Sequence, residues 1–239
     1  MTAGKTLLVF GARHLGRTLA RELAAEGWNV AAVARSEETI AALREALPGV
    51  LAIVGDAGNA DDVEHAFAET QKRFGPIDLV VNAITARPRG SFGGGTLAEA
   101  APDAMEPYVD ELLPATFNVL RTGCRVLGGQ GRGTIVQVTG GSARRGMAGR
   151  GAWAAAAFAT RALTQAAALE SREQGVHVAL LIVDATIDSE KTRDRLQGPP
   201  EASTSEEDVV SAVAYLESQS PRAWTHELQI TPRLDRWVP

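Results

Sequence analysis

The fold is decided by the stretch Lys5-Thr-Leu-Leu-Val-Phe-Gly-Ala-Arg-His-Leu-Gly-Arg-Thr-Leu-Ala20. Its first six residues form a short apolar run typical of a buried strand, and its last residues open a helical pattern. Between them lies a turn bounded by Gly11 and Gly16. Gly11 permits a sharp turn, and Gly16 lets the helix pack closely on the strand. Because the free N–H groups at the start of such a helix attract a pyrophosphate, the stretch predicts a nucleotide-binding α/β fold.

The alternation of short apolar runs and longer helical patterns continues along the chain, which predicts a parallel sheet with helices on both faces. We expect a single-domain, doubly wound, Rossmann-like α/β sheet over residues 1–239, since this length suffices for one complete core. Strands are predicted over Lys5–Phe10, Asn29–Ala34, Val50–Val54, Asp78–Asn82, Thr134–Val138, His177–Val183 and Glu227–Thr231. Helices are predicted over Leu15–Glu26, Glu37–Ala46, Asp61–Phe74, Glu106–Leu127, Trp153–Glu173 and Ser205–Ser218, the last capped by Thr204 or Ser205 with Asp208 in its first turn.

Composition excludes several classes of protein. The net charge of -5 and the pI near 5.5 give no electrostatic reason to bind nucleic acid or an anionic membrane. Cys124 is the single cysteine, which excludes an internal disulfide framework and a cysteine-based metal cluster. The sequence begins without a charged leader and a long apolar stretch, and it holds no run of about 20 apolar residues. We therefore expect a soluble, cytoplasmic protein.

A second stretch carries a family resemblance: Gly151-Ala-Trp-Ala-Ala-Ala-Ala-Phe-Ala-Thr-Arg-Ala-Leu-Thr-Gln-Ala-Ala-Ala-Leu-Glu170. Together with Val81-Asn82-Ala83-Ile84 and the order of the other elements, it resembles the short-chain dehydrogenase/reductase family. That family places a Tyr and, four residues later, a Lys in this helix. In the register set by Leu163-Thr164 and Leu169-Glu170, Trp153 stands at the Tyr position and Ala157 at the Lys position.

The resemblance implies a carbonyl reductase whose proton-delivery residues are missing. Gly140, thirteen residues before Trp153, falls at the family's Ser position. Ser142, two residues further on, is the candidate replacement through a shift of its loop. Asn118, in the context Ala-Thr-Phe-Asn-Val, resembles the catalytic Asn of the family. Trp153 can donate a hydrogen bond from its indole, but an indole does not give up its proton near neutral pH.

The resemblance also implies a nicotinamide cofactor held at the glycine turn by Gly11, Arg13, His14, Leu15 and Gly16. The turn has four residues between its outer glycines where the family has five, and it lacks the third glycine. Weak or absent cofactor binding is therefore the alternative. Arg35 and Ser36 follow the second strand, where NAD-binding members carry an acid. Since Arg35 and Arg13 can grip a 2′-phosphate, NADP is the expected cofactor.

Further cofactor contacts are expected where other strands end. Asp56, after the third strand, resembles the residue that contacts adenine, and it could equally cap the helix that follows. The resemblance places Asn82 and Ala83 beside the cofactor after the fourth strand. It places Ile187 and Ser189 beside the nicotinamide, in a loop where Asp184-Ala185 replaces the family's Pro-Gly.

Candidate substrate contacts lie on the loops after the fourth, fifth and sixth strands. Trp153 is either an aromatic platform for a flat substrate or a packing residue. Arg144 is the favoured arginine of a set that either converges on an anionic group or is solvated; the others are Arg145, Arg150, Arg87 and Arg89. The segment Ser189–Thr204, polar and interrupted by Gly198-Pro199-Pro200, predicts a mobile lid or an ordinary surface connection.

Two functions are compatible with these residues. The first is an atypical NADPH-dependent reductase of a small molecule that stabilises negative charge itself, such as a quinone or a conjugated aromatic ketone. Such a reaction needs alignment for hydride transfer but not an acid, whose contribution is about 10²–10⁴-fold. The second is a non-redox protein on the same scaffold: a cyclase, a dehydratase or a nucleotide-binding pseudoenzyme. The helices Glu106–Leu127 and Trp153–Glu173 resemble the pair through which the family dimerises, so we expect a homodimer or homotetramer.

Overall fold

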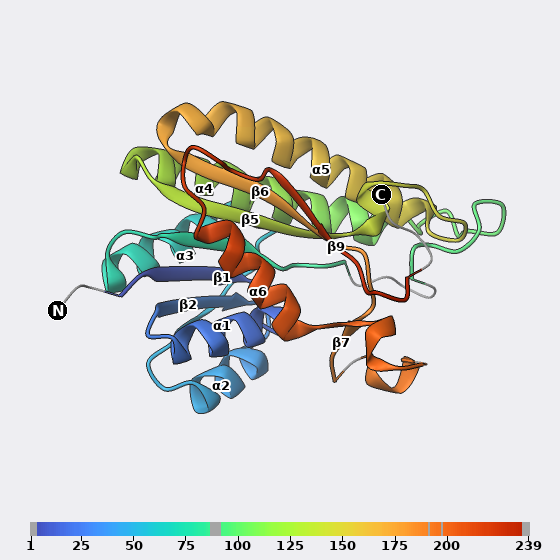
Figure 1. The fold of residues 1–239 in the computed structure, drawn as a ribbon, viewed down its shortest axis with the longest axis horizontal. Helices are drawn as coiled ribbons and strands as arrows, with labels where there is room; N and C mark the ends of the chain where they lie inside the picture. Colours follow the sequence, from blue (N-terminus) through green and yellow to red (C-terminus); the bar gives the residue numbers. More distant parts are fainter. Residues whose placement is uncertain (1–3, 87–91, 191, 197, 236–239) are drawn as a thin grey trace.

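The computed structural model describes residues 4–86, 92–190, 192–196 and 198–235. It contains a parallel sheet of seven strands in the order β3-β2-β1-β4-β5-β6-β9, with helices on both faces (Figure 1). The predicted doubly wound, Rossmann-like α/β fold is thereby confirmed. The strands of this sheet are β1 (Thr6–Phe10), β2 (Asn29–Ala34), β3 (Leu51–Val54), β4 (Leu79–Asn82), β5 (Gly133–Gly140), β6 (Val176–Val183) and β9 (Glu227–Ile230).

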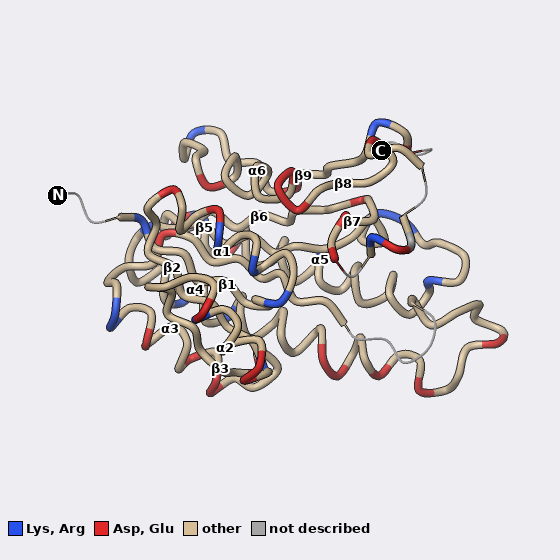
Figure 2. Tube along the Cα trace, turned by 90° about the horizontal axis from the view of Figure 1, so that it is seen from below, with Lys and Arg blue, Asp and Glu red and all other residues tan. Residues whose placement is uncertain are grey.

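Two hydrophobic clusters sandwich the sheet, because successive side chains of a strand point to opposite faces. On β1, Leu7 and Val9 pack with α1 (Leu15–Ala25), α2 (Glu37–Ala46) and α6 (Glu206–Glu217). Leu8 and Phe10 pack with α3 (Ala60–Phe74), α4 (Leu113–Gln130) and α5 (Gly151–Ser171) on the other face. The strands β1 to β6 contain no Lys, Arg, Asp or Glu, and Figure 2 shows both charge colours on helices and loops. Burial on both faces explains these near-continuous apolar strands.

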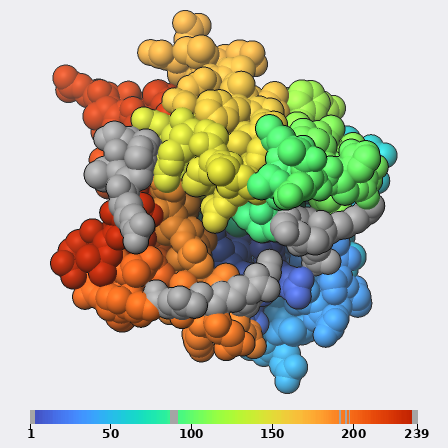
Figure 3. All heavy atoms as spheres, turned by 90° about the vertical axis from the view of Figure 1, so that its right-hand side faces the viewer, coloured from blue at the N-terminus to red at the C-terminus, as the bar shows by residue number. Residues whose placement is uncertain are grey.

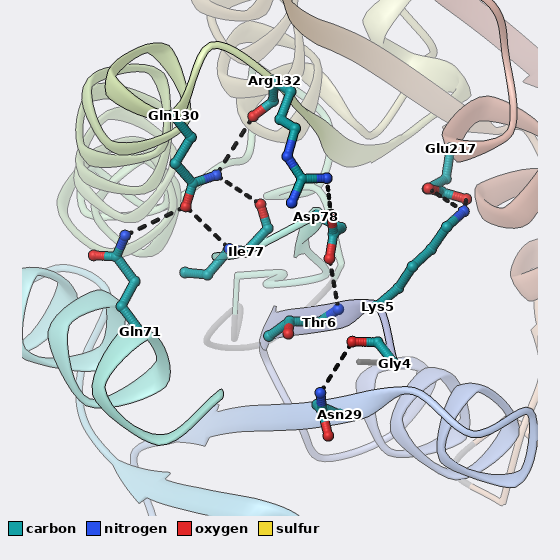
Figure 4. Close-up of polar contacts among 10 residues, drawn as sticks. All are labelled: Gly4, Lys5, Thr6, Asn29, Gln71, Ile77, Asp78, Gln130, Arg132 and Glu217. Carbon is teal, nitrogen blue, oxygen red and sulfur yellow. Dashed lines mark hydrogen bonds and ion pairs between the residues drawn. The ribbon is translucent and has the colours of Figure 1, made fainter. Parts of the chain in front are cut away.

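The amino-terminal edge of the sheet is tied together by side chains that bridge neighbouring elements (Figure 4). The Gln130 amide at the end of α4 accepts a hydrogen bond from the Ile77 N–H at 3.0 Å and donates one to the Ile77 carbonyl at 2.9 Å. Asp78 accepts from the Thr6 N–H at 2.9 Å and from the Arg132 guanidinium at 2.7 Å. Backbone groups that the strand ends leave open therefore find side-chain partners here.

The helix predicted over Glu106–Leu127 is divided in two. A π-helical segment, η1, covers Pro107–Leu112, and α4 follows directly from Leu113. Pro114 has no N–H to donate to the carbonyl of the preceding turn, which favours this wider turn over a regular helix. The extra residue in the turn rotates the face that α4 presents to the rest of the molecule.

The segment between β6 and α6 is organised by a small two-stranded pairing that the sequence did not predict. β7 (Ile187–Asp188) pairs in parallel with β8 (Thr204–Ser205), so the segment 189–203 leaves and returns at the same place. The Thr192 hydroxyl accepts from the Ser189 N–H at 3.0 Å and donates to the Ile187 carbonyl. Ser205 caps α6, one of the two caps predicted, and it forms a reciprocal capping box with Asp208. In the described part of the chain, no helix is long and apolar enough to span a membrane.

Candidate active site at the carboxyl edge of the sheet

The candidate site residues gather at the carboxyl edge, where the strands of a parallel sheet deliver their loops to one place. Figure 3 looks onto this edge. The blue of the turn after β1 lies between the orange of the β7–β8 segment and the yellow-green of the loop that joins β5 to α5. Three loops from distant parts of the sequence thus border one another, which is the arrangement that a binding site requires.

The glycine turn has the shape that its two glycines demand. Gly11 has φ +90°, and a Cβ there would lie 3.0 Å from the Ala83 carbonyl carbon and oxygen. A Cβ on Gly16 would lie 2.5 Å from the Gly11 oxygen, so α1 reaches the turn only without a side chain at that position. Leu15 is buried in the core, which leaves its backbone as the part that can contact a ligand. Ala83 is held against the turn, since its N–H donates to the Phe10 carbonyl at 3.0 Å.

The residues that stand where the family has its third glycine need no left-handed backbone. Among the described residues only glycines have a positive φ, so Ala12, Arg13, His14 and Leu15 all keep a negative φ. His14 occupies the N-cap position of α1, and its side chain makes no capping hydrogen bond within the described structure. The N-terminus of α1 is therefore not sealed by its own cap residue, which fits the turn to an anionic group.

Asn82 supports the turn from beneath. It is fully buried, its amide donates to Gln137 Oε1 at 2.9 Å, and its oxygen accepts from the Ile84 N–H at 3.2 Å. The side chain thereby fixes the backbone of Ala83 and Ile84 where β4 ends. Asn82 is placed to act on a ligand through these neighbours.

Arg35, at the end of β2, is not a free cation. Its Nη1 lies 3.4 Å from Glu111 Oε2 and 3.8 Å from Asp56 Oδ2. Ser36 caps α2, where its hydroxyl accepts from the Thr39 N–H at 3.4 Å. Asp56 accepts from the Gly58 N–H at 2.9 Å, whereas the cap of α3 is Asn59, so the capping alternative for Asp56 is wrong. Arg13 is exposed and forms no ion pair with any described residue.

Positions 140 and 153 face each other. A Cβ on Gly140 would lie 3.4 Å from Trp153 Cζ2 and 3.6 Å from its Nε1. Ala157, one helical turn along α5, is fully buried and packs in one hydrophobic cluster with Trp153. The indole N–H thus lies beside the backbone at the end of β5.

Trp153 belongs to an aromatic wall that the sequence did not reveal. Its ring centroid lies 5.4 Å from that of Phe92 and 5.9 Å from that of Tyr108. Tyr108 is fully buried and its hydroxyl accepts from the Gly93 N–H at 2.7 Å. Burial raises the pKa of Tyr108, so the phenol stays protonated near neutral pH. Nothing in the spacing of residues 92, 108 and 153 relates them, because three different elements bring them together.

The two residues proposed for catalysis each have a local role in the structure. The Asn118 amide donates to the Ala57 and Gly58 carbonyls, both at 3.0 Å, and so holds the loop between β3 and α3. Ser142 is fully buried in a 3-10 turn, and its Oγ has no hydrogen-bond partner among the described residues. Its neighbour Ala143 packs in one cluster with Trp153. The catalytic roles of Asn118 and Ser142 stay predictions.

The arginines after β5 do not converge on one point. Arg145 forms a two-pronged ion pair with Asp184, at 2.6 and 3.3 Å, and Gln229 donates to the same carboxylate at 3.1 Å. Arg144, the candidate substrate contact, lies 3.6 Å from Glu227. The Arg150 guanidinium stands 5.7 Å from the centre of the Phe92 ring. Arg87 and Arg89 lie outside the described residues.

Glu227 holds the loop between β5 and α5 through its ion pair with Arg144. Burial acts to raise the pKa of this carboxyl, but hydrogen bonds from Arg161 and Gln165 hold it below its ordinary value. Asp184 is mostly buried and occupies the space where a Cβ of residue 141 would stand, 1.8 Å from its Oδ1. The glycine at position 141 is therefore a requirement of the ion pair between Asp184 and Arg145.

Ile187 and Ser189 border the site from the sixth strand. Ile187 lies in β7 and packs partly against the core, and the Ser189 hydroxyl lies 3.0 Å from that of Thr192. Both residues thus lie where the segment 189–203 begins and have contacts within the protein there. Their contact with a cofactor remains a prediction.

Residues 5–196 match the family described as short chain dehydrogenase. The chain belongs to the short-chain dehydrogenase family. Members of this family are oxidoreductases that use a nicotinamide cofactor, and the chain is of that type.

Two relatives of this short-chain dehydrogenase show the range of similarity. It is 32% identical over 178 residues to a 3beta-hydroxysteroid dehydrogenase of Mediterraneibacter gnavus, a match that covers 72% of the chain and 62% of the relative's length. It is 28% identical over 236 residues to a 3-oxoacyl-[acyl-carrier-protein] reductase of Staphylococcus aureus, covering 93% of the chain and 94% of the relative. A serine dehydrogenase complexed with NADP+ shares the fold, with a TM-score of 0.85 at 18% identity, over 98% of this chain and 97% of that one.

Proposed function

We propose that the chain is an NADPH-dependent reductase of a flat carbonyl substrate that stabilises negative charge on its own oxygen, such as a quinone or a conjugated aromatic ketone. The observation that carries this proposal is Trp153. Its indole stands over the backbone of Gly140, with Phe92 and Tyr108 beside it. An aromatic wall at this place favours a flat, conjugated partner by offset or edge-to-face contact.

The absence of an ionisable side chain at positions 140, 153 and 157 decides which substrates are suitable. Without a general acid, the reaction is slower by about 10²–10⁴-fold than with one. A substrate whose product anion is spread over a ring system needs less of that help. The residues of the chain then have to bind and orient the substrate, and the indole N–H can donate one hydrogen bond to its oxygen.

The cofactor would be held by the turn Gly11–Gly16 and by the N-terminus of α1, next to Ala83. When bound, it supplies the hydride. Support for the phosphorylated form comes from Arg35 and Arg13, and from the absence of an acid at the end of β2. The serine dehydrogenase that shares the fold is complexed with NADP+, which agrees with this choice.

Titration with NADPH and NADH, followed by nicotinamide fluorescence, tests the cofactor proposal. NADPH should bind more tightly, and Arg35→Ala should weaken it by about 1.5–3 kcal/mol, the scale of a hydrogen bond to a charged group. Arg44→Ala is the matched control, because Arg44 pairs with Glu37 on the surface of α2. Equal affinity of the unmodified protein for both cofactors would reject the proposal.

NADPH oxidation across a panel of carbonyl compounds tests the substrate class. Quinones and phenol-conjugated ketones should turn over, and simple aliphatic ketones should not. Trp153→Phe keeps an aromatic ring but removes the N–H. It should hurt mainly through KM if the indole is only a platform, and should also lower kcat if the N–H bonds the substrate oxygen. Aliphatic ketones reduced as fast as quinones would contradict the mechanism.

A second function, a non-redox nucleotide-binding scaffold, is favoured by one observation. Ser142 is sealed in the interior, and Asn118 is committed to the loop after β3. Neither therefore replaces the missing acid. Clear cofactor binding without turnover on any member of the panel would favour this second function over the first.

We also propose that the chain forms a homodimer or homotetramer through α4 and α5. Phe117, Phe158 and Leu169 on these helices expose 51%, 44% and 66% of their surface, which is costly for large apolar side chains in a monomer. Light scattering should give at least twice the 25.2 kDa of the chain. Phe158→Glu should shift the mass toward the monomer, whereas a monomer already in the unmodified protein would exclude this assembly.

A further inference from the structure

Arg35 has two carboxylates near one nitrogen of its guanidinium group, and both come from other elements of the chain. Glu111 is 76 residues distant from it, and its Oε2 approaches Arg35 Nη1 to 3.4 Å. Asp56 approaches the same nitrogen to 3.8 Å. The Arg35 and Glu111 side chains are 42% and 39% exposed, so the pair lies at the surface and an arriving ligand can reach it.

These neighbours change the charge that an incoming phosphate meets. Arg13 and Arg35 supply two positive charges, and Asp56 and Glu111 supply two negative ones. The local balance is neutral, whereas the sequence of the turn and of β2 alone suggested a site with two uncompensated cations. A phosphate at Arg35 must displace or tolerate the carboxylates, and each like charge nearby weakens its binding.

We propose that Glu111 sets the discrimination between NADPH and NADH by competing with the 2′-phosphate for Arg35. This inference rests on the proposed NADPH-dependent function. Glu111 takes part in no other interaction that the described residues show, so its carboxylate is free to leave Arg35 when a stronger anion arrives. Asp56 is less free, because its other oxygen accepts from the Gly58 N–H.

The π-helical segment η1 explains why Glu111 is held at this place. Tyr108 and Leu112, on the same segment, are buried and pack with Trp153. These two anchors leave Glu111 facing Arg35 while Asp110, beside it, is exposed. A change at Glu111 that preserves its size therefore leaves the aromatic wall intact.

The variant Glu111→Gln tests the inference, with Asp110→Asn as the matched control that removes the same charge one residue away. Calorimetry would measure the dissociation constants of NADPH and NADH. It would also measure those of adenosine 2′,5′-bisphosphate, which has a 2′-phosphate, and of AMP, which has none; both lack the nicotinamide. Glu111→Gln should tighten NADPH and the bisphosphate by about 3- to 10-fold at low salt, as expected for one like charge removed at the protein surface. NADH and AMP should change less than about twofold, the range that surface charges at a distance produce.

The outcomes separate the inference from the function on which it rests. If the unmodified protein prefers NADPH but Glu111→Gln and Asp110→Asn give the same affinities, the inference is wrong and the function stands. If neither the protein nor Glu111→Gln binds any of the four ligands, both are wrong. In the Arg35→Ala background, Glu111→Gln should no longer change the affinity for NADPH. If it still tightened NADPH there, Glu111 would not act by competing for Arg35, and the inference would be overturned.

Discussion

The two edges of the sheet are built on opposite principles. At the amino edge, Gln130, Asp78 and Arg132 satisfy the backbone groups around β1, β4 and β5 with short hydrogen bonds (Figure 4). At the carboxyl edge, glycines replace side chains at positions 11, 16, 140 and 141, and the Ser142 hydroxyl is buried without a described partner. The first edge closes the fold, and the second leaves backbone and space available for a ligand. Changes at the first edge should therefore reduce stability alone, and changes at the second should affect both stability and binding.

The largest expected effect is that of Gly141→Ala at the carboxyl edge. The new methyl would stand 1.8 Å from Asp184 Oδ1, so the Asp184–Arg145 pair must separate or the loop must move. We expect a loss of about 3 kcal/mol in the free energy of unfolding, combining overpacking with a broken, largely buried ion pair. Urea denaturation measures it. Gly146→Ala on the same loop meets nothing within 4 Å and serves as the control; equal midpoints for the two variants would refute the prediction.

Next in size is Gln130→Ala at the amino edge. It leaves the Ile77 N–H and carbonyl without their side-chain partner in a largely buried position. The expected cost is about 2 kcal/mol in the free energy of unfolding, with NADPH affinity unchanged. Gln71→Ala, which loses a single 3.3 Å hydrogen bond to Gln130, should cost far less. A change in cofactor affinity with Gln130→Ala would mean that the two edges are coupled.

A smaller effect is expected for Asn118→Ala. The variant removes two hydrogen bonds to the Ala57 and Gly58 carbonyls, which should lower the free energy of unfolding by about 1–2 kcal/mol. Turnover of a quinone should change little, because the Asn118 amide is engaged by the two carbonyls of the loop after β3. A large fall in kcat at unchanged stability would restore the catalytic role that the sequence suggested for Asn118.

The smallest effect concerns His177, at the start of β6. Its Nε2 lies 2.9 Å from the Thr225 carbonyl, and its ring stacks on Trp224 with centroids 5.1 Å apart. Burial lowers the pKa of His177 below its ordinary value, so the folded state disfavours the protonated ring.

Since the unfolded chain takes up a proton near pH 6.5, stability should be complete above that pH and should fall as the pH drops toward the lower pKa of the folded state. In His177→Gln the free energy of unfolding should fall less between pH 7 and pH 5 than in the unmodified protein. The difference should be at most about 1.4 kcal/mol per pH unit. His65→Gln, which changes an exposed imidazole, is the control variant. An identical profile for all three proteins would show that burial of His177 does not contribute.

The sequence predicted what depends on local period and spacing. The apolar run Lys5–Phe10 predicted a strand, and β1 covers Thr6–Phe10. The residue types at the start of the last helix predicted a cap by Thr204 or Ser205 with Asp208 in the first turn, and Ser205 is the cap.

The sequence could not predict contacts between side chains that are far apart along the chain. The π-helical segment before α4 and the hydrogen bond of Asn118 to the loop after β3 both leave no local signature in the sequence. The partners of Arg35 and Arg145 lie 76 and 39 residues away, so no local pattern records them. Arg35 was expected to face a ligand, and Arg145 was expected either to face an anionic group or to be solvated. The structure shows that each has a carboxylate partner.

The pairing of β7 with β8 has a consequence for how this protein can change over time. Because Ile187 lies opposite Thr204, the segment 189–203 forms a closed appendix whose two ends share one attachment point on the domain. Lengthening or rewriting such an appendix adds little loop entropy and disturbs none of the seven central strands. Variants in which the whole segment 189–203 is replaced would have a different border around the same glycine turn. The choice of ligand could then change while the fold stays the same.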